Sequence, residues 1–153
     1  MNKNHLEILK EKISLLSQSA DWVKRSYEQC IKIGAKHDYS KDEFDKFENL
    51  TSRYARTTDM LINQTLRSLD TVELVDSGTI IDIMNRAEKR GIVESSQTLH
   101  ELKDLRNEIA HEYQIAQIEQ FFESVLTATP ILLKIIDNLQ LYSEKYTNAG
   151  QNT

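Results

Sequence analysis

Residues that break helices are scarce in this chain: four glycines and one proline occur in 153 residues. Between them, apolar side chains recur every three or four positions, the spacing that places them on one face of a helix. Turn-rich β folds need more glycine and proline than this. The pattern therefore predicts an all-α protein, long enough for one domain whose core needs neither disulfides nor metal ions.

Four interruptions divide the apolar pattern, at residues 34–40, 76–78, 91–96 and in a short stretch after Tyr113. Five helices are expected between them: Leu6 to Gly34, Ser40 through Leu69, residues 79–90, about Ser95 or Ser96 through Ile109, and about Ile115 to Tyr146. Short connections between helices favour an up-and-down bundle. Residues 1–146 therefore form one expected helical domain, and the polar residues 147–153 an expected disordered tail.

Several helix ends carry recognisable signals. Gly34 and Gly91 are suited to the turn that closes a helix. Ser40 is followed three residues later by Glu43, the spacing of a capping box at a helix start. Pro130 falls within the fifth expected helix, where it should kink or break the helix because it lacks a backbone donor and crowds the preceding turn.

Charge and cysteine content narrow the classes of protein. The net charge of −5 and the isoelectric point near 5.4 argue against an extended surface that coats nucleic acid. A small basic cluster, or one assembled from two copies of the chain, stays possible. The single cysteine, Cys30, excludes an internal disulfide and is expected to be a small core residue rather than a nucleophile. Without an apolar run of membrane-spanning length or a signal peptide, a cytoplasmic location is expected.

The fourth expected helix carries the candidate site. At 100° per residue, Leu102, Leu105 and Ile109 form its core side. The opposite side bears a continuous polar stripe, with residues four, three and four positions apart: His100, Asp104, Asn107 and His111. Arg106 and Tyr113 lie together on a flank, roughly 140° from His111 around a regular helix. A site built from Arg106 and His111 therefore needs a distorted helix, a curled arginine or a second chain.

The string Arg106-x4-His111-x-Tyr113, with Asn107 directly after the arginine, resembles the signature motif of the HEPN superfamily. Within that superfamily the chain looks most like the HepT-like toxins, which are paired with a minimal nucleotidyltransferase. The segment 83–92 before the motif helix, and the five-helix plan over nearly the whole chain, are similar to the family's layout.

This resemblance implies a function and roles for particular residues. The protein would be the toxin of a toxin–antitoxin pair, a metal-independent endoribonuclease without a cofactor, whose site forms between two motif helices of a homodimer. Arg106 and His111 would be catalytic. From their place on the polar stripe, Asn107 could orient the imidazole or bond the phosphate, and Asp104 could fix the histidine tautomer or simply face solvent. Tyr113 would accept AMP groups from the nucleotidyltransferase antitoxin, which would add bulk and negative charge beside the cleft that binds RNA.

The chemistry agrees with that implication. RNA cleavage requires removal of the ribose 2′-OH proton, attack on the adjacent phosphorus and protonation of the leaving 5′-oxygen. A histidine imidazole titrates near neutral pH and can act as base or acid. An arginine guanidinium stays charged and can hold two phosphate oxygens. A metal site at His100, Asp104 and His111 is less favoured, because these spacings do not match common zinc motifs.

Two other functions remain open. One is a non-catalytic helical subunit that binds a minimal nucleotidyltransferase and presents substrate to it or regulates it. The other is a structural dimerisation bundle, which leaves Arg106 and His111 without a role. Five further basic residues are candidates for contact with RNA or a partner, although solvated helix faces explain each of them better: Arg53, Arg56, Arg86, Lys89 and Arg90.

Overall fold

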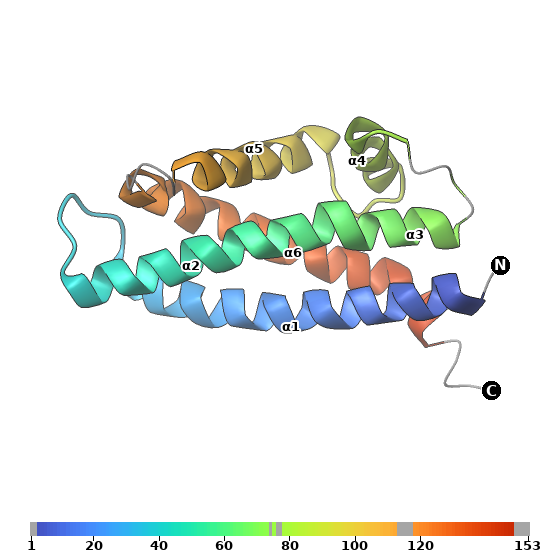
Figure 1. Cartoon of the computed structure of the whole chain (residues 1–153), viewed down its shortest axis with the longest axis horizontal. Coiled ribbons are helices and arrows are strands. Elements are labelled where there is room, and N and C mark those ends of the chain that lie inside the picture. The colour runs from blue at the N-terminus through green and yellow to red at the C-terminus, as the bar shows by residue number, and fades with distance from the viewer. Residues whose placement is uncertain (1–2, 74, 76–77, 113–117, 149–153) are drawn as a thin grey trace.

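The computed structural model describes residues 3–73, 75, 78–112 and 118–148 (Figure 1). The described residues form α1 (Lys3–Ile33), α2 (Lys41–Asp59), a π-helical segment η1 (Met60–Thr65), α3 (Leu66–Val72), α4 (Ile80–Lys89), α5 (Ser96–Glu112), a 3-10 turn η2 (Ile118–Phe121) and α6 (Phe122–Thr147). These residues contain no strand. The predicted all-α bundle is confirmed.

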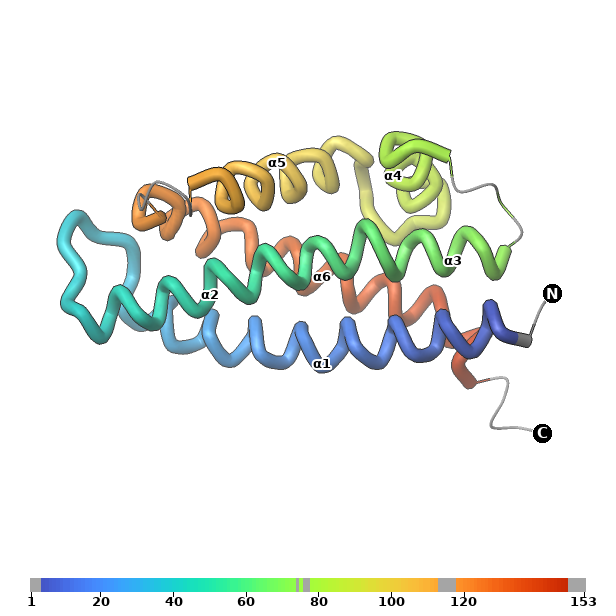
Figure 2. The backbone as a smooth tube through the Cα atoms, in the orientation of Figure 1, coloured from blue at the N-terminus to red at the C-terminus, as the bar shows by residue number. Residues whose placement is uncertain are grey.

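The helices stack in layers (Figures 1 and 2). In these views α1 lies on one side and α4 and α5 on the other, with the α2–η1–α3 rod and α6 between them. α1 packs against α2, α3 and α6, while α5 packs against α2, α4 and α6. At the end where α1 turns into α2, rings from three parts of the chain contact one another: Tyr39, Phe44, Phe47 and Phe122. The motif helix α5 is therefore an outer helix supported from within.

The predicted helix ends are confirmed. Gly34 has φ 76° and its N–H bonds the Cys30 carbonyl at 2.9 Å, so it closes α1 in the left-handed conformation that glycine adopts without strain. At the start of α2 the Ser40 N–H donates to the Glu43 carboxylate at 2.9 Å, and the Glu43 N–H donates to the Ser40 hydroxyl at 3.2 Å. These ends depend on residues within one turn of each other, which is why the sequence predicts them.

The second helix differs from the expected regular helix. It continues to Val72, but between Met60 and Thr65 it widens into a π-helix, and the Leu66 N–H bonds the Leu61 carbonyl five residues back. A π-helical turn changes which side chains face the core on either side of it. Asp59 is the last residue before this segment, half-buried at its edge.

The fifth helix is not broken at Pro130. α6 runs from Phe122 to Thr147 through the proline, which is exposed. The missing N–H costs one backbone hydrogen bond, while buried Val125 and Leu132 hold the helix to the core on both sides. The expected start at about 115 lies outside the described residues, as does the end of the expected tail, 149–153.

A buried ionic network joins α3, α4 and α6. Asp70 is fully buried. Its carboxylate forms ion pairs with Arg86 at 2.9 Å and with Arg90 at 2.6 Å, and Arg90 forms a second ion pair with Glu73 at 2.7 Å. Glu73 in turn accepts hydrogen bonds from the hydroxyls of Tyr142 and Tyr146. Burial would raise the pKa of Glu73, but hydrogen bonds from Tyr146 and Tyr142 and the charge of Arg90 hold it below its ordinary value.

This lowered pKa makes the network sensitive to acid. A carboxyl whose folded-state pKa is depressed contributes stability above its ordinary pKa of 4.5 and loses that contribution as the pH falls through the lowered value. Urea denaturation from neutral pH into the acid range should show wild type losing stability more steeply than Glu73→Gln, which does not ionise. Parallel curves for the two proteins would contradict this role of Glu73.

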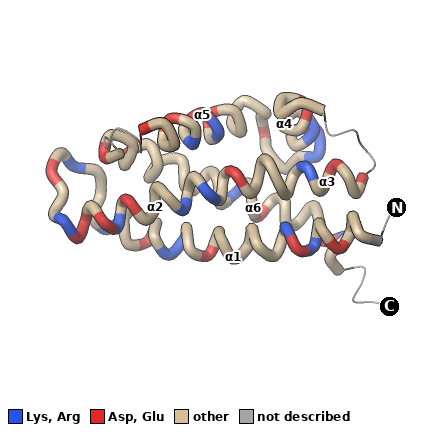
Figure 3. The backbone as a smooth tube through the Cα atoms, in the orientation of Figure 1, with Lys and Arg blue, Asp and Glu red and all other residues tan. Residues whose placement is uncertain are grey.

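The described helices include none that is long and apolar enough to cross a membrane. Acidic and basic side chains are interspersed along the helices in the view of Figure 3.

Candidate active site on the motif helix

The motif occupies the second half of α5. The helix begins at Ser96, as expected, and its buried side chains Leu99, Leu102 and Ile109 face the core. The Tyr54 hydroxyl on α2 donates to the Leu102 carbonyl at 3.0 Å, which fixes α5 against α2. The motif side chains are therefore displayed from a helix anchored on its inner face.

Arg106 points from α5 toward α2. Its Nη2 contacts the Asp59 carboxylate at 2.5 Å, and its Nη1 donates to the Asn107 side-chain oxygen at 3.3 Å. The side chains of Arg106 and Asp59 are each about one third exposed. Asp59 also accepts from Asn63 at 3.1 Å, so one carboxylate beside the π-helical segment holds the guanidinium in place.

His111 lies away from this ion pair. It lies in the last turn of α5 and is exposed. Asn107 and Asp104, earlier in the helix, are also exposed, whereas His100 near the start of the helix is half-buried. The described residues show no hydrogen bond or ion pair between Arg106 and His111. The expected separation of the two side chains is confirmed: within one chain they face different directions, Arg106 toward α2 and His111 toward solvent. Tyr113 lies outside the described residues.

Asp59 is the functional candidate that the sequence analysis missed. It stands 47 residues before Arg106, in a run of α2 that has no motif of its own. No local pattern could have found it, because its importance comes from the packing of α2 against α5 and from the π-helical segment that follows it.

Three of the other basic candidates have partners within the chain. Arg86 and Arg90 form ion pairs with buried Asp70 and are largely covered, so they do not belong to a solvated helix face. Arg53 donates to the Ser26 hydroxyl at 2.6 Å and lies over the Trp22 ring. Arg56 and Lys89 are exposed on α2 and α4. A basic surface for RNA in one chain is therefore smaller than the five residues suggested.

Cys30 is fully buried, and burial raises the pKa of its thiol to about 11. It is thus a core residue, as expected, and not an activated nucleophile. Among the residues that the structure describes, no group of three or more His, Cys, Asp or Glu side chains is arranged to hold a metal ion.

The hollow between α5 and α6 lies on another side of α5. Its volume is about 390 Å³, and Thr98, Glu101 and Leu105 line it together with residues of α6. Of the motif residues that the structure describes, Arg106, Asn107 and His111 do not line this hollow.

Comparison with protein-family models, with curated proteins and with solved structures found no match to this chain. The fold places the protein in the class of all-α bundles. A proposal for its function therefore rests on the motif and on the geometry of α5.

Proposed function

We propose that the protein is a metal-independent endoribonuclease, the toxin of a toxin–antitoxin pair, with a site that two copies of the chain complete along α5. The observation that carries the proposal is the arrangement of the HEPN-like motif. Its two expected catalytic side chains occupy one outer helix but face different directions, and the stripe with Asp104, Asn107 and His111 is exposed. A twofold pairing of α5 would place Arg106 of one copy near His111 of the other.

The reaction follows from these two groups. His111 takes the proton of the ribose 2′-OH, the 2′-oxygen forms a bond to phosphorus, and the bond between phosphorus and the 5′-oxygen breaks. The proton held by the His111 imidazolium then returns to the leaving 5′-oxygen. The products are a 2′,3′-cyclic phosphate and a 5′-hydroxyl. Arg106 stabilises the negative charge on the phosphoryl oxygens. Asp59 orients Arg106, and Asn107 contacts the same guanidinium.

The motif's resemblance also supports a regulatory step at Tyr113. A minimal nucleotidyltransferase would transfer AMP from ATP to the phenolic oxygen and release pyrophosphate. The attached phosphate would compete electrostatically for the arginines that bind RNA. This step is tested by mass: co-expression with the enzyme should add multiples of AMP to wild type and none to Tyr113→Phe.

One observation favours a second function, a non-catalytic subunit that binds a nucleotidyltransferase. Asp59 neutralises Arg106 within the same chain, and the chain as a whole carries a net charge of −5. A binding role needs no free cation at this position. The two functions differ in what the isolated protein does to RNA.

Expression of the chain without a partner separates them. Wild type should arrest growth and fragment cellular RNA, whereas His111→Ala and Arg106→Ala should do neither, because general acid–base catalysis alone contributes roughly 10²–10⁴-fold. His37→Ala is the matched control, since His37 is exposed in the connection between α1 and α2 and should leave activity intact. A harmless wild type that leaves RNA whole refutes the nuclease and supports the binding subunit.

A further inference from the structure

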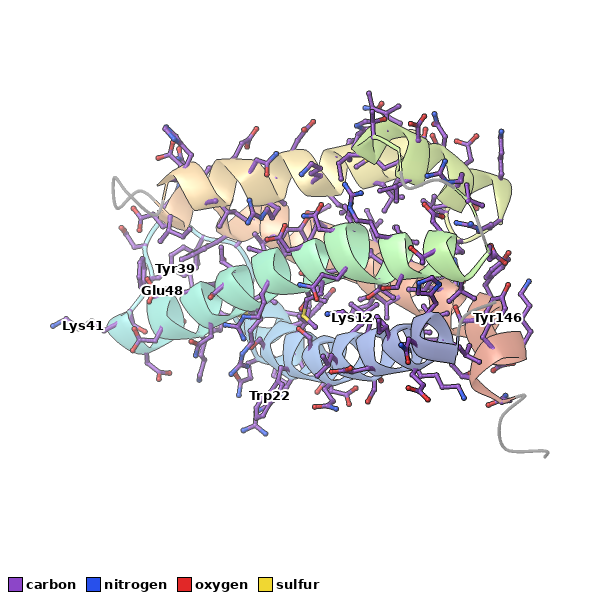
Figure 4. All side chains as sticks on the ribbon, turned by 45° about the vertical axis from the view of Figure 1, so that its right-hand side comes forward. Lys12, Trp22, Tyr39, Lys41, Glu48 and Tyr146 are labelled. Atoms are coloured by element: carbon purple, nitrogen blue, oxygen red, sulfur yellow. The ribbon has the colours of Figure 1, made fainter. Side chains whose placement is uncertain are left out.

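The outer side of α1 carries a row of exposed apolar residues. Ile8, Leu15 and Trp22 are 44%, 39% and 55% exposed. Each is seven residues, or about two helical turns, from the next, so all three lie on the same side of α1 along about 21 Å of the helix. Figure 4 shows Trp22 projecting away from the bundle. Such a row is a candidate contact surface, because a partner that covered it would remove apolar area from water.

A hollow lies beside the first residue of this row. It has a volume of about 290 Å³ between α1 and the η1–α3 segment, and its lining includes Ile8, Lys12, Gln64 and Arg67. Lys12 donates to Gln64 at 3.2 Å across its floor, joining the two helices. The hollow is thus a concave feature next to Ile8, at the opposite end of the row from the bulky Trp22.

Trp22 is held in position. The Arg53 guanidinium lies 4.9 Å from the centre of the indole ring, and its Nη1 is fixed by the Ser26 hydroxyl at 2.6 Å. A side chain that is already ordered loses little entropy when a partner covers it. Trp22 therefore has the character of an anchor residue at an interface.

We propose that this row is the interface with a second copy of the chain, packed antiparallel about a twofold axis at Leu15. Because Leu15 is equally far from Ile8 and Trp22, antiparallel pairing sets Leu15 on Leu15 and places each Trp22 against the partner's Ile8. The indole then fills the hollow beside Ile8. The cations Lys12 and Arg67 can contact the ring there, as Arg53 does within its own chain.

Charge along the row fits the same arrangement. Glu7 and Glu11 are exposed before Leu15, and Asp21 and Arg25 are exposed after it on the same flank of α1. In an antiparallel pair equal flanks meet, so Glu7 of one copy lies near Arg25 of the other, and this contact occurs twice. Asp21 lies nearer the partner's Glu11 and offsets part of this attraction. Parallel pairing would set Trp22 on Trp22 and leave both hollows empty.

This interface is separate from the one in the proposed function. α1 and α5 lie on opposite sides of the bundle in Figures 1 and 2. If both pair, every α5 dimer carries two α1 faces, so the α1 contacts link dimers into assemblies of four or more chains; if only α1 pairs, the protein is a dimer. In the first case loss of the α1 contact leaves the α5 dimer and in the second it leaves the monomer, and RNA cleavage plays no part in the readout.

Light scattering on the size-fractionated chain tests the contact. Trp22→Glu and Leu15→Glu should each lower the mass of wild type at least twofold, to that of the α5 dimer or the monomer. Ile81→Glu on α4, where Ile81 is 56% exposed, should leave it unchanged. Circular dichroism checks that each variant keeps its helices. A monomeric wild type, or a mass that both α1 variants leave unchanged, overturns the proposal.

Trp22 is the only tryptophan, so its fluorescence reports this surface directly. On dilution, wild-type emission should move to longer wavelength as the indole becomes exposed, and Leu15→Glu should show the long-wavelength emission at every concentration. The proposal is overturned if the emission wavelength does not change with protein concentration and is the same in wild type and Leu15→Glu.

Disulfide trapping decides the orientation. Leu15→Cys should cross-link to itself, and Ile8→Cys mixed with Trp22→Cys should form a cross-linked pair. Neither Ile8→Cys nor Trp22→Cys alone should do so. Wild type, whose single Cys30 is buried, is the control for non-specific oxidation. Self-cross-linking of Ile8→Cys indicates parallel pairing and overturns the antiparallel interface.

Discussion

Replacement of Asp70 with alanine should lower the free energy of unfolding by about 3–5 kcal/mol, the loss typical when one partner of a buried ion pair is removed. Asp70 is fully buried and is the common partner of Arg86 and Arg90. Its removal takes from Arg86 and Arg90 the buried carboxylate that both contact, although Arg90 keeps its contact with Glu73. A loss of this size is a large fraction of the roughly 5–15 kcal/mol that stabilises a typical domain.

The effect should extend to α4 as a whole. This helix has only ten residues, too few to be stable without its contacts, and the Asp70 network is its ionic link to α3. Urea denaturation followed by circular dichroism measures the loss. Asp70→Asn, which keeps an acceptor but not the charge, should fall between wild type and Asp70→Ala.

Asp42→Ala is the matched control. Asp42 pairs with Lys46 at 3.0 Å, but its side chain is 77% exposed, so the pair should contribute less than about 1 kcal/mol. If Asp70→Ala costs no more than Asp42→Ala, then the buried network does not stabilise the fold in the way that its geometry indicates.

Mixing two inactive variants should restore RNA cleavage if the site is shared between chains. Arg106→Ala and His111→Ala should each lose roughly 10²–10⁴-fold in cleavage rate. In a mixed dimer, the intact Arg106 of one chain meets the intact His111 of the other, and one of the two sites is complete. When subunits exchange freely, the mixture should therefore reach about a quarter of the wild-type rate.

The alternative geometry gives a different result. If Arg106 and His111 of one chain act together after a rearrangement of α5, each chain in the mixture carries a defective site and no activity returns. The double variant Arg106→Ala/His111→Ala mixed with wild type is the control, because its mixed dimers contain no complete shared site. With free exchange in an equal mixture, a shared site should leave this control about a quarter of the activity of the same total amount of wild type, whereas a single-chain site should leave about a half. Recovery in the first mixture together with the lower value in the control identifies a shared site.

Local features of this fold could be predicted from the sequence. Ser40 with Glu43, and Gly34, mark helix ends because the groups that bond there lie within a turn of each other. The polar stripe of α5 follows from residue spacing alone, since a helix fixes the direction of each side chain. The separation of Arg106 from His111 was predictable for the same reason.

Tertiary packing decided the surroundings of those residues. Asp59 reaches Arg106 only because α2 packs against α5 beside a π-helical turn, and Arg86 and Arg90 turn inward only because α3 buries Asp70 beneath α4. Pro130 was expected to kink or break α6, and the helix is not broken there, because the core contacts on both sides of it outweigh one missing hydrogen bond. The two ionic contacts join residues that are far apart in the chain. At Pro130 the outcome depends on how much apolar surface the helix buries on either side of the proline.

The sequence by itself thus determined the helices, their ends and the residues that α5 presents to solvent, because these depend on neighbours within a few positions. Only the tertiary structure decided which charges are held within the chain and which surfaces stay uncovered. The Asp59–Arg106 pair and the exposed row on α1 both arise from where helices meet or fail to meet. That depends on the packing of the whole bundle, which no local spacing specifies.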